Sequence, residues 1–160
     1  MAQKPLDKKK AAIIEYSAGG VVFRAARKEF ELAFVLDSTK KWTFPKGHIR
    51  RGEKIEEAAK RESEEEMGLH GLQTIRRLGQ IDIWFVDKYV HKGALIHKYI
   101  YYVLMRAPSY ARLRIPPRPK RGEPLFGVRW MPLQEALQFS NYKDVQPILK
   151  RAIEAIEKIR

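Results

Sequence analysis

The sequence contains no cysteine, which excludes disulfide bonds, thiolate metal sites and a cysteine nucleophile. It also lacks any apolar run near the ~20 residues that a helix needs to cross a bilayer. Its first ten residues, MAQKPLDKKK, are basic, but no apolar segment of signal-peptide length follows them. These absences predict a protein outside the membrane, and we expect it in the cytoplasm.

Acidic residues are scarce, since 19 Asp and Glu stand against 32 Lys and Arg and leave a net charge of +13. This surplus favours anionic partners such as nucleic acid, nucleotides or other polyphosphates, although a basic surface can also serve solubility alone. Seven of the 14 glutamates nevertheless fall within residues 53–66, namely Glu53, Glu56, Glu57, Glu62, Glu64, Glu65 and Glu66. So dense a cluster in a basic chain requires its own explanation.

The 160 residues have the length of one domain, and a 44% hydrophobic content predicts a folded core. We expect a flexible basic tail over residues 1–10 and a single domain over 11–160. Runs of β-branched and aromatic residues predict strands at 12–24, 30–37, 73–87, 97–107 and 125–132. Gly19-Gly20 inside the first run predicts a bulge or a close backbone approach.

Helices are predicted at 55–67, where Gly68 supplies a left-handed end, at 132–139, and in an amphipathic closing segment from Val145 to Ile159. The segment 88–95 is read as a hairpin link, and the Pro-rich stretch 112–124 as a loop. This order predicts an α+β fold, an α/β/α sandwich in which a mixed sheet is packed between helices.

The helix at 55–67 places Glu62, Glu65 and Glu66 on one face. Like charges at this spacing destabilise an isolated helix by a few tenths of a kcal/mol per pair, and acids near its C-terminus oppose the helix dipole. The alternative to a functional site is an ordinary surface helix whose charged side chains are solvated. The concentration of carboxylates favours a divalent cation instead, and oxygen-only ligands suit Mg²⁺ or Mn²⁺.

The spacing of these residues follows a known signature. Gly47, five residues, Glu53, seven residues and then Arg61-Glu62-Ser63-Glu64-Glu65-Glu66-Met67-Gly68-Leu69 resembles the Nudix box. Ser63 departs from it, because the family usually has an aliphatic residue there, and we expect weaker packing under the helix. The resemblance continues at residues 17–22, 42–48 and 129–132 and covers most of the chain.

The resemblance implies a Nudix hydrolase of the MutT-like kind, in which water and Mg²⁺ or Mn²⁺ cleave a diphosphate linked to a further group. Glu62, Glu65, Glu66 and the carbonyl of Gly47 are then the implied metal ligands. Arg61 is expected to hold a box glutamate, and Glu53 to complete that network.

The general base varies within the family between the box and a later loop. Glu123 is the loop candidate, with an ordinary loop charge as the alternative reading. Many relatives carry an acid at the position of Gly127, so its absence shifts weight to the box glutamates.

Other basic and aromatic side chains are candidates for substrate binding. Lys46, His48, Arg50 and Arg51 flank the expected metal loop and are candidates to contact phosphates. Lys98 is a candidate for holding a phosphate and Tyr99 for stacking on a base, although strand aromatics more often lie in the core. Trp84 and Phe85 alternate, so only one of them can face the cleft. The five cations of 112–121 either bind a polyphosphate tail or form a solvated loop.

The loop Phe44-Pro45-Lys46-Gly47-His48, preceded by Trp42, resembles the branch that hydrolyses diadenosine polyphosphates. Diadenosine tetraphosphate, cleaved to ATP and AMP, is therefore the favoured small-molecule substrate. The alternatives are oxidised dGTP, a diphosphoinositol polyphosphate and the 5′ end of RNA, with RNA a less favoured partner. A Nudix fold that only binds nucleotide or RNA is the alternative outside enzymes.

Overall fold

The computed structural model describes residues 11–116 and 124–159. Its elements agree closely with the predicted ones, to which the structure adds the short strands β3 and β4 and the 3-10 helices. In chain order they are β1 (Ile13–Ala25), β2 (Phe30–Leu36), β3 (Trp42–Thr43), β4 (Lys46–His48), α1 (Ile55–Met67), β5 (Gln73–Val86), β6 (Leu95–Arg106), β7 (Gly127–Pro132), η1 (Leu133–Glu135), α2 (Ala136–Phe139), η2 (Lys143–Val145) and α3 (Gln146–Glu157).

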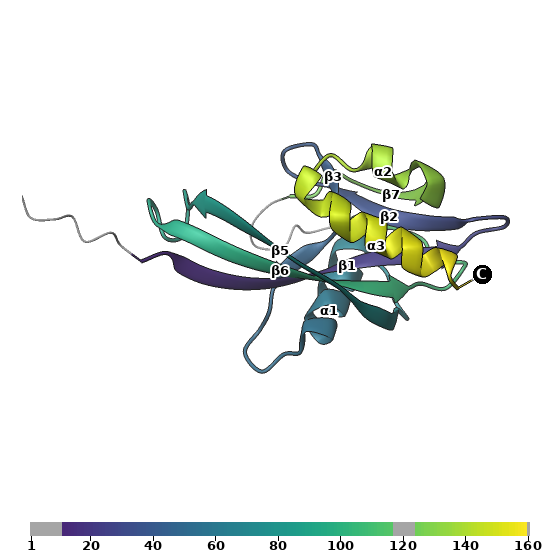
Figure 1. The fold of residues 1–160 in the computed structure, drawn as a ribbon, viewed down its shortest axis with the longest axis horizontal. Coiled ribbons are helices and arrows are strands. Elements are labelled where there is room, and N and C mark those ends of the chain that lie inside the picture. Colours follow the sequence, from purple (N-terminus) through teal and green to yellow (C-terminus); the bar gives the residue numbers. More distant parts are fainter. Residues whose placement is uncertain (1–10, 117–123, 160) are drawn as a thin grey trace, which may run out of the picture.

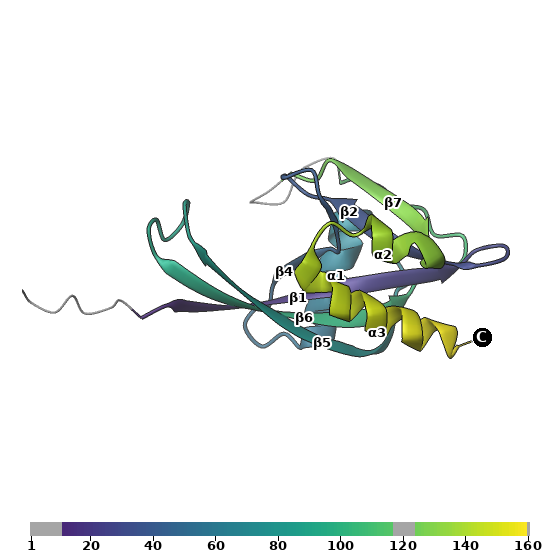
Figure 2. The ribbon, with the colours of Figure 1, turned by 45° about the horizontal axis from the view of Figure 1, so that its top comes forward.

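The strands form one mixed sheet in the order β3-β2-β1-β6-β5, with β7 paired to β2 and β4 paired to β1. The long central pair β1–β6 is parallel, and the other pairs are antiparallel. Along one edge, β1 pairs first with β4 at residues 17–19 and then with β2 at residues 23–25. The β5–β6 hairpin and the start of β1 extend away from the helices (Figures 1 and 2).

The sheet buries a hydrophobic core on each face, as expected for an α/β/α sandwich. Val21, Phe23, Phe34 and Leu104 pack with α3 on one face. Val22, Val35, Val103 and Met105 pack with α1 on the other. Because side chains alternate along each strand, both faces of β1 and β6 are used. The views agree in placing α1 and α3 on opposite sides of the sheet (Figures 1 and 2).

The absence of side chains at Gly19 and Gly20 allows two neighbouring groups to approach the backbone of β1 closely. A Cβ on Gly19 would lie 2.5 Å from the carbonyl oxygen of Pro45, and one on Gly20 would lie 2.0 Å from Ser63 Oγ. The close backbone approach predicted at these glycines is confirmed. Ser63 is fully buried against the sheet, and its hydroxyl donates to the Ala59 carbonyl at 2.7 Å.

Helix α1 ends as predicted, because Gly68 adopts the left-handed conformation at φ 64°. The segment predicted as one helix at 132–139 is divided: β7 runs to Pro132, and a 3-10 turn precedes the four-residue α2. Among the described residues, no helix is long and apolar enough to span a membrane. The expected tail, Glu123 and the cations Arg118, Lys120 and Arg121 lie outside the described residues.

Candidate active site

A cavity of about 550 Å³ opens where α1, the β3–β4 segment and the extended ends of β5 and β6 meet. Its walls combine carboxylates and cations from α1 and β4 with apolar side chains from the sheet. The lining residues are Ser17, Val35, Asp37, Thr43, Phe44, Lys46, Gly47, His48, Arg50, Arg61, Glu62, Glu66, Ile83, Phe85, Lys98 and Leu125. The glutamate-rich segment and the expected phosphate ligands therefore share one cavity.

Gly47 lies directly against the carboxylate of Glu62. A Cβ at Gly47 would stand 2.2 Å from Glu62 Cδ and 2.3 and 2.4 Å from its two oxygens. Glu62 is only 2% exposed, so its head is enclosed between the backbone of β4 and the helix. Any larger residue at position 47 would displace this carboxylate.

Arg61 connects three of the box glutamates. Its guanidinium donates from Nε to Glu53 Oε1 at 2.7 Å and from Nη2 to Glu53 Oε2 at 2.9 Å, a bidentate pair. Nη1 donates to Glu62 Oε1 at 2.6 Å and lies 3.7 Å from Glu65 Oε2. Nη2 also donates to the His48 carbonyl at 3.1 Å, which ties the helix to β4.

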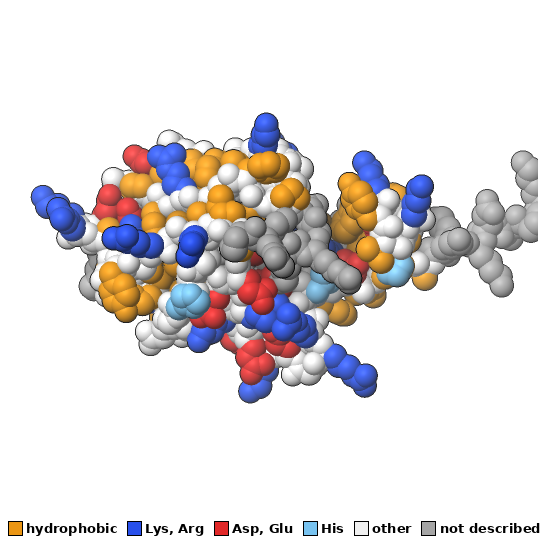
Figure 3. Space-filling view, turned by 180° about the vertical axis from the view of Figure 1, so that it is seen from behind, with side chains coloured by type: hydrophobic (Ala, Val, Ile, Leu, Met, Phe, Trp, Pro, Cys, Tyr) orange, Lys and Arg blue, Asp and Glu red, His pale blue; other side chains and the backbone are white. Residues whose placement is uncertain are grey.

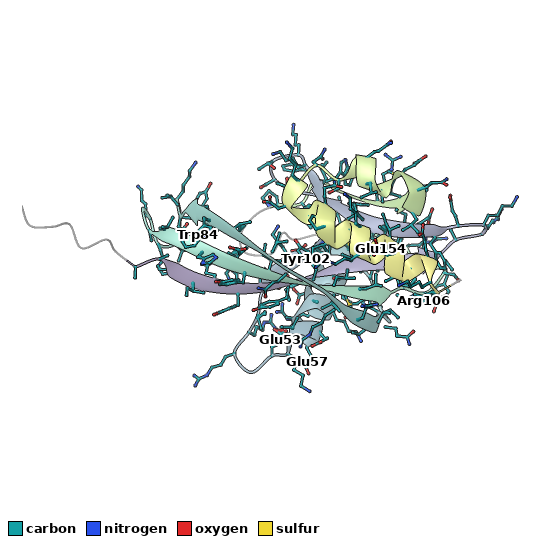
Figure 4. All side chains as sticks on the ribbon, in the orientation of Figure 1. Glu53, Glu57, Trp84, Tyr102, Arg106 and Glu154 are labelled. Carbon is teal, nitrogen blue, oxygen red and sulfur yellow. The ribbon has the colours of Figure 1, made fainter. Side chains whose placement is uncertain are left out.

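These contacts shift the ionisation of both partners. The hydrogen bonds from Arg61 are the largest cause that lowers the pKa of Glu53 to about 2, and the amide of Arg50 adds to it. The same contacts, those with Glu53 first, raise the pKa of Arg61. Glu53 is therefore a fixed anion that holds Arg61, and Arg61 in turn holds Glu62. Figure 4 shows Glu53 at the α1 side of the molecule, beside Glu57.

The expected metal ligands are only partly brought together. Gly47, Glu62 and Glu66 line the cavity, whereas Glu65 is exposed and does not. Within residues 11–116 and 124–159, no three His, Asp or Glu side chains converge closely enough to form a metal site by themselves. The donors present are hard oxygens, and the missing side chain of Gly47 leaves room for the Glu62 carboxylate beside the backbone of β4. Their chemistry fits a divalent cation.

The basic wall of the cavity comes from two strands. Lys46 and His48 lie on β4, and Lys98 lies on β6. Glu15 of β1 stands between the strands, with Oε2 3.5 Å from Lys98 Nζ and 4.0 Å from His48 Nε2. Arg50 also lines the cavity, whereas Arg51 is exposed outside it. Most of the predicted phosphate ligands are thus gathered, with Glu15 holding Lys98 in place.

Lys98 and Tyr99 are on opposite faces of the sheet because they are consecutive on a strand. Lys98 points into the cavity, whereas Tyr99 stacks on Tyr16 with ring centroids 5.7 Å apart. Tyr99 therefore does not line the cavity, and the expected base stacking by Tyr99 beside Lys98 does not agree with this geometry. The same alternation places Phe85 in the cavity and leaves Trp84 on the other face.

Asp37 is a cavity residue that the sequence reasoning missed. Burial works to raise the pKa of its carboxyl, but hydrogen bonds from Tyr142, Thr39 and Lys41 together lower it. The bond from Tyr142 joins the segment before α3 to the end of β2. An aspartate directly after a strand was the only sequence signal, and the partner 105 residues away was not visible.

Comparison with known proteins agrees with this geometry. A family model described as "NUDIX domain" matches residues 15–154. The curated Mycobacterium tuberculosis protein named "Putative mutator protein MutT4" is 31% identical, over 91% of this chain and 57% of the relative. The chain thus spans little more than half of that relative's length.

Solved structures share the fold. The chain matches the Caenorhabditis elegans Ap4A hydrolase binary complex with a TM-score of 0.68 and 21% identity, over 90% of this chain and 98% of that one. It matches the E. coli dihydroneopterin triphosphate pyrophosphohydrolase with a TM-score of 0.67 and 13% identity, over 89% and 99%. From the family match, with Gly47, Arg61, Glu62 and Glu66 of the box lining one cavity, we conclude that this chain belongs to the NUDIX family.

Proposed function

We propose that this chain is a metal-dependent pyrophosphohydrolase that adds water across a phosphoanhydride bond of diadenosine tetraphosphate, giving ATP and AMP. The observation that carries the proposal is one cavity with carboxylates on the α1 side and Lys46, His48 and Lys98 on the strands. A nucleoside polyphosphate needs both charges, because cations bind its phosphates and carboxylates hold its metal. The net charge of +13 further favours a long, highly charged substrate.

The residues divide this work by their positions. Lys46, His48 and Lys98 bind phosphate oxygens, and Glu15 orients Lys98 through their 3.5 Å contact. Arg61, held by Glu53, positions the Glu62 carboxylate. Arg61 and Glu53 are positioning residues, because they act through the Glu62 carboxylate.

Gly47, Glu62 and Glu66, which line the cavity, are the residues that would hold Mg²⁺ or Mn²⁺, together with the exposed Glu65, whose carboxylate lies 3.7 Å from Arg61 Nη1. Such a cation, when bound, neutralises phosphate oxygens and lowers the pKa of a bound water. A box glutamate takes the proton from the attacking water. The carboxylate of the buried Glu62 is held in position for metal binding or proton transfer, because Arg61 and the Gly47 backbone enclose it.

The apolar part of the cavity suits a base. Ile83 and Phe85 of β5 contribute apolar side chains to its lining. An adenine stacked there would leave the phosphate chain at the strand cations. The fold shared with a protein named Ap4A hydrolase supports this substrate.

A second candidate is the removal of pyrophosphate from oxidised dGTP. The curated relative at 31% identity is named as a mutator protein, which favours a triphosphate. Hydrolysis of a diphosphoinositol polyphosphate or of the 5′ end of RNA would use the same cations and carboxylates.

The test is a hydrolysis screen with product identification in Mg²⁺, in Mn²⁺ and in chelator. It compares diadenosine tetra-, penta- and hexaphosphate, oxidised dGTP, a diphosphoinositol polyphosphate and 5′-triphosphate RNA. Glu65→Gln removes a proposed ligand, and Glu64→Gln is the matched control with the same charge change one residue away. We expect ATP and AMP from the tetraphosphate, lost in Glu65→Gln and kept in Glu64→Gln.

Faster turnover of oxidised dGTP than of diadenosine tetraphosphate would make oxidised dGTP the preferred substrate. The proposed metal-dependent hydrolysis would stand unchanged. Turnover that persists in chelator would refute the metal requirement. No turnover of any compound would favour a binding module that has lost catalysis.

A further inference from the structure

Four rings form a column on the sheet face opposite the cavity wall made by Lys98 and Phe85. Trp84 stacks on His97 with centroids 3.8 Å apart and planes at 17°. His97 contacts Tyr99 at 4.4 Å, and Tyr99 stacks on Tyr16 at 5.7 Å and 16°. The column crosses β5, β6 and β1, and we call these four residues the aromatic column.

The two ends of the column are open. Trp84 is 56% exposed and Tyr16 is 50% exposed, whereas the side chain of His97 between them is 13% exposed. The inner rings are covered by their neighbours, whereas about half of the surface of each end residue is exposed to solvent. Figure 4 places Trp84 on the projecting hairpin, away from the helices. The proposed hydrolysis uses none of these rings.

A flat π-face in a basic protein suits a nucleobase. Bases stack on aromatic side chains with little regard to sequence, and nearby cations bind the phosphates. The hairpin turn beyond Trp84 supplies exposed Lys88 and Lys92 and the 86% exposed Tyr89. In the space-filling view this end of the molecule shows hydrophobic, Lys or Arg and His side chains together (Figure 3).

We propose that the aromatic column is a binding site for single-stranded RNA, in which one base stacks on Trp84, another on Tyr16, and the lysines of the hairpin turn bind the phosphates. Asp82 selects RNA over DNA in this arrangement. The side chain of Asp82 is 54% exposed, and its Oδ2 lies 2.9 Å from His97 Nε2, within hydrogen-bond distance. A carboxylate among the rings repels phosphate but accepts a hydrogen bond from a ribose 2′-hydroxyl, which DNA lacks.

The test is fluorescence anisotropy with a labelled ~12-nucleotide single strand, a length within the range such sites cover. The strand has a 5′-hydroxyl and the buffer contains chelator, so the proposed active site has nothing to cleave. Trp84→Ala and Tyr16→Ala are compared with Trp84→Phe and with Tyr110→Ala, a control whose ring is 82% exposed elsewhere. We expect each alanine at the column to weaken the Kd about tenfold, as the loss of one stacked base requires.

The other expected results are near-normal binding by Trp84→Phe and Tyr110→Ala, weaker binding of DNA of the same sequence, and no displacement by diadenosine tetraphosphate. Unchanged binding in both alanine variants would overturn the proposal. Displacement by diadenosine tetraphosphate would assign RNA to the cavity instead. Equal binding of DNA would refute the role of Asp82. A dimer in sedimentation that dissociates in Trp84→Ala would show that a second copy of the chain covers the column.

Discussion

Replacing Gly47 with alanine tests whether the position of the Glu62 carboxylate controls the reaction. The added methyl carbon would lie 2.2 Å from Glu62 Cδ, whereas non-bonded carbons rest about 3.5–4.0 Å apart. The carboxylate must therefore retreat by more than about 1 Å. Its 2.6 Å bond to Arg61 then stretches or breaks. A misplacement of about 1 Å costs on the order of 100-fold in rate, so we expect kcat to fall by about that factor.

The assay is steady-state hydrolysis of the best substrate from the screen, with thermal unfolding measured in parallel. The contact is with the end of a side chain rather than with backbone, so the fold should survive the change. Gly127→Ala is the matched control, since its Cβ would come no closer than 3.3 Å to Trp42. A Gly47→Ala protein with normal kcat would refute the view that Gly47 is required to hold Glu62 in place.

Three further predictions follow from named contacts. Gly20→Ala should lower the free energy of unfolding by about 2 kcal/mol through overpacking, because its Cβ would lie 2.0 Å from Ser63 Oγ. In a Ser63→Ala background the loss should shrink, and strict additivity in urea denaturation would contradict this contact. Glu53→Gln should cost about 2 kcal/mol at pH 7, since it breaks the pair with Arg61. The folded-state pKa of Glu53 is about 2 against an ordinary 4.5, so this contribution is complete above pH 4.5 and disappears as the pH falls toward 2. A difference between the two proteins that stays constant from pH 7 to 2 would exclude the pair as its source. Lys98→Ala should raise KM about tenfold through a lost phosphate contact, whereas Tyr99→Ala should change it less than about twofold. The reverse order in initial-rate measurements would mean that the substrate uses the other face of the sheet.

The local sequence pattern was sufficient to predict most of the helices and strands. The helix from Ile55 to Met67 was predicted to the residue, because it lacks Gly and Pro and ends at a glycine that adopts φ 64°. The glycine pair of β1 likewise indicated the close approach of the Pro45 loop. The segment after Pro132 was harder, since seven residues divide between a 3-10 turn and a short helix whose packing is set by Phe34 and Trp42.

The box spacing by itself determined the family and identified Gly47, Arg61, Glu62 and Glu66 of the cavity, because a motif on one loop and one helix is local in sequence. Only the tertiary structure decided which strand residues join them. The parallel pairing of β1 with β6 sets Glu15 against Lys98, and no local pattern encodes that register. The same pairing sends Lys98 to the cavity and Tyr99 to the aromatic column. Two neighbours in sequence are thus separated by the sheet, because consecutive side chains of a strand point to opposite faces.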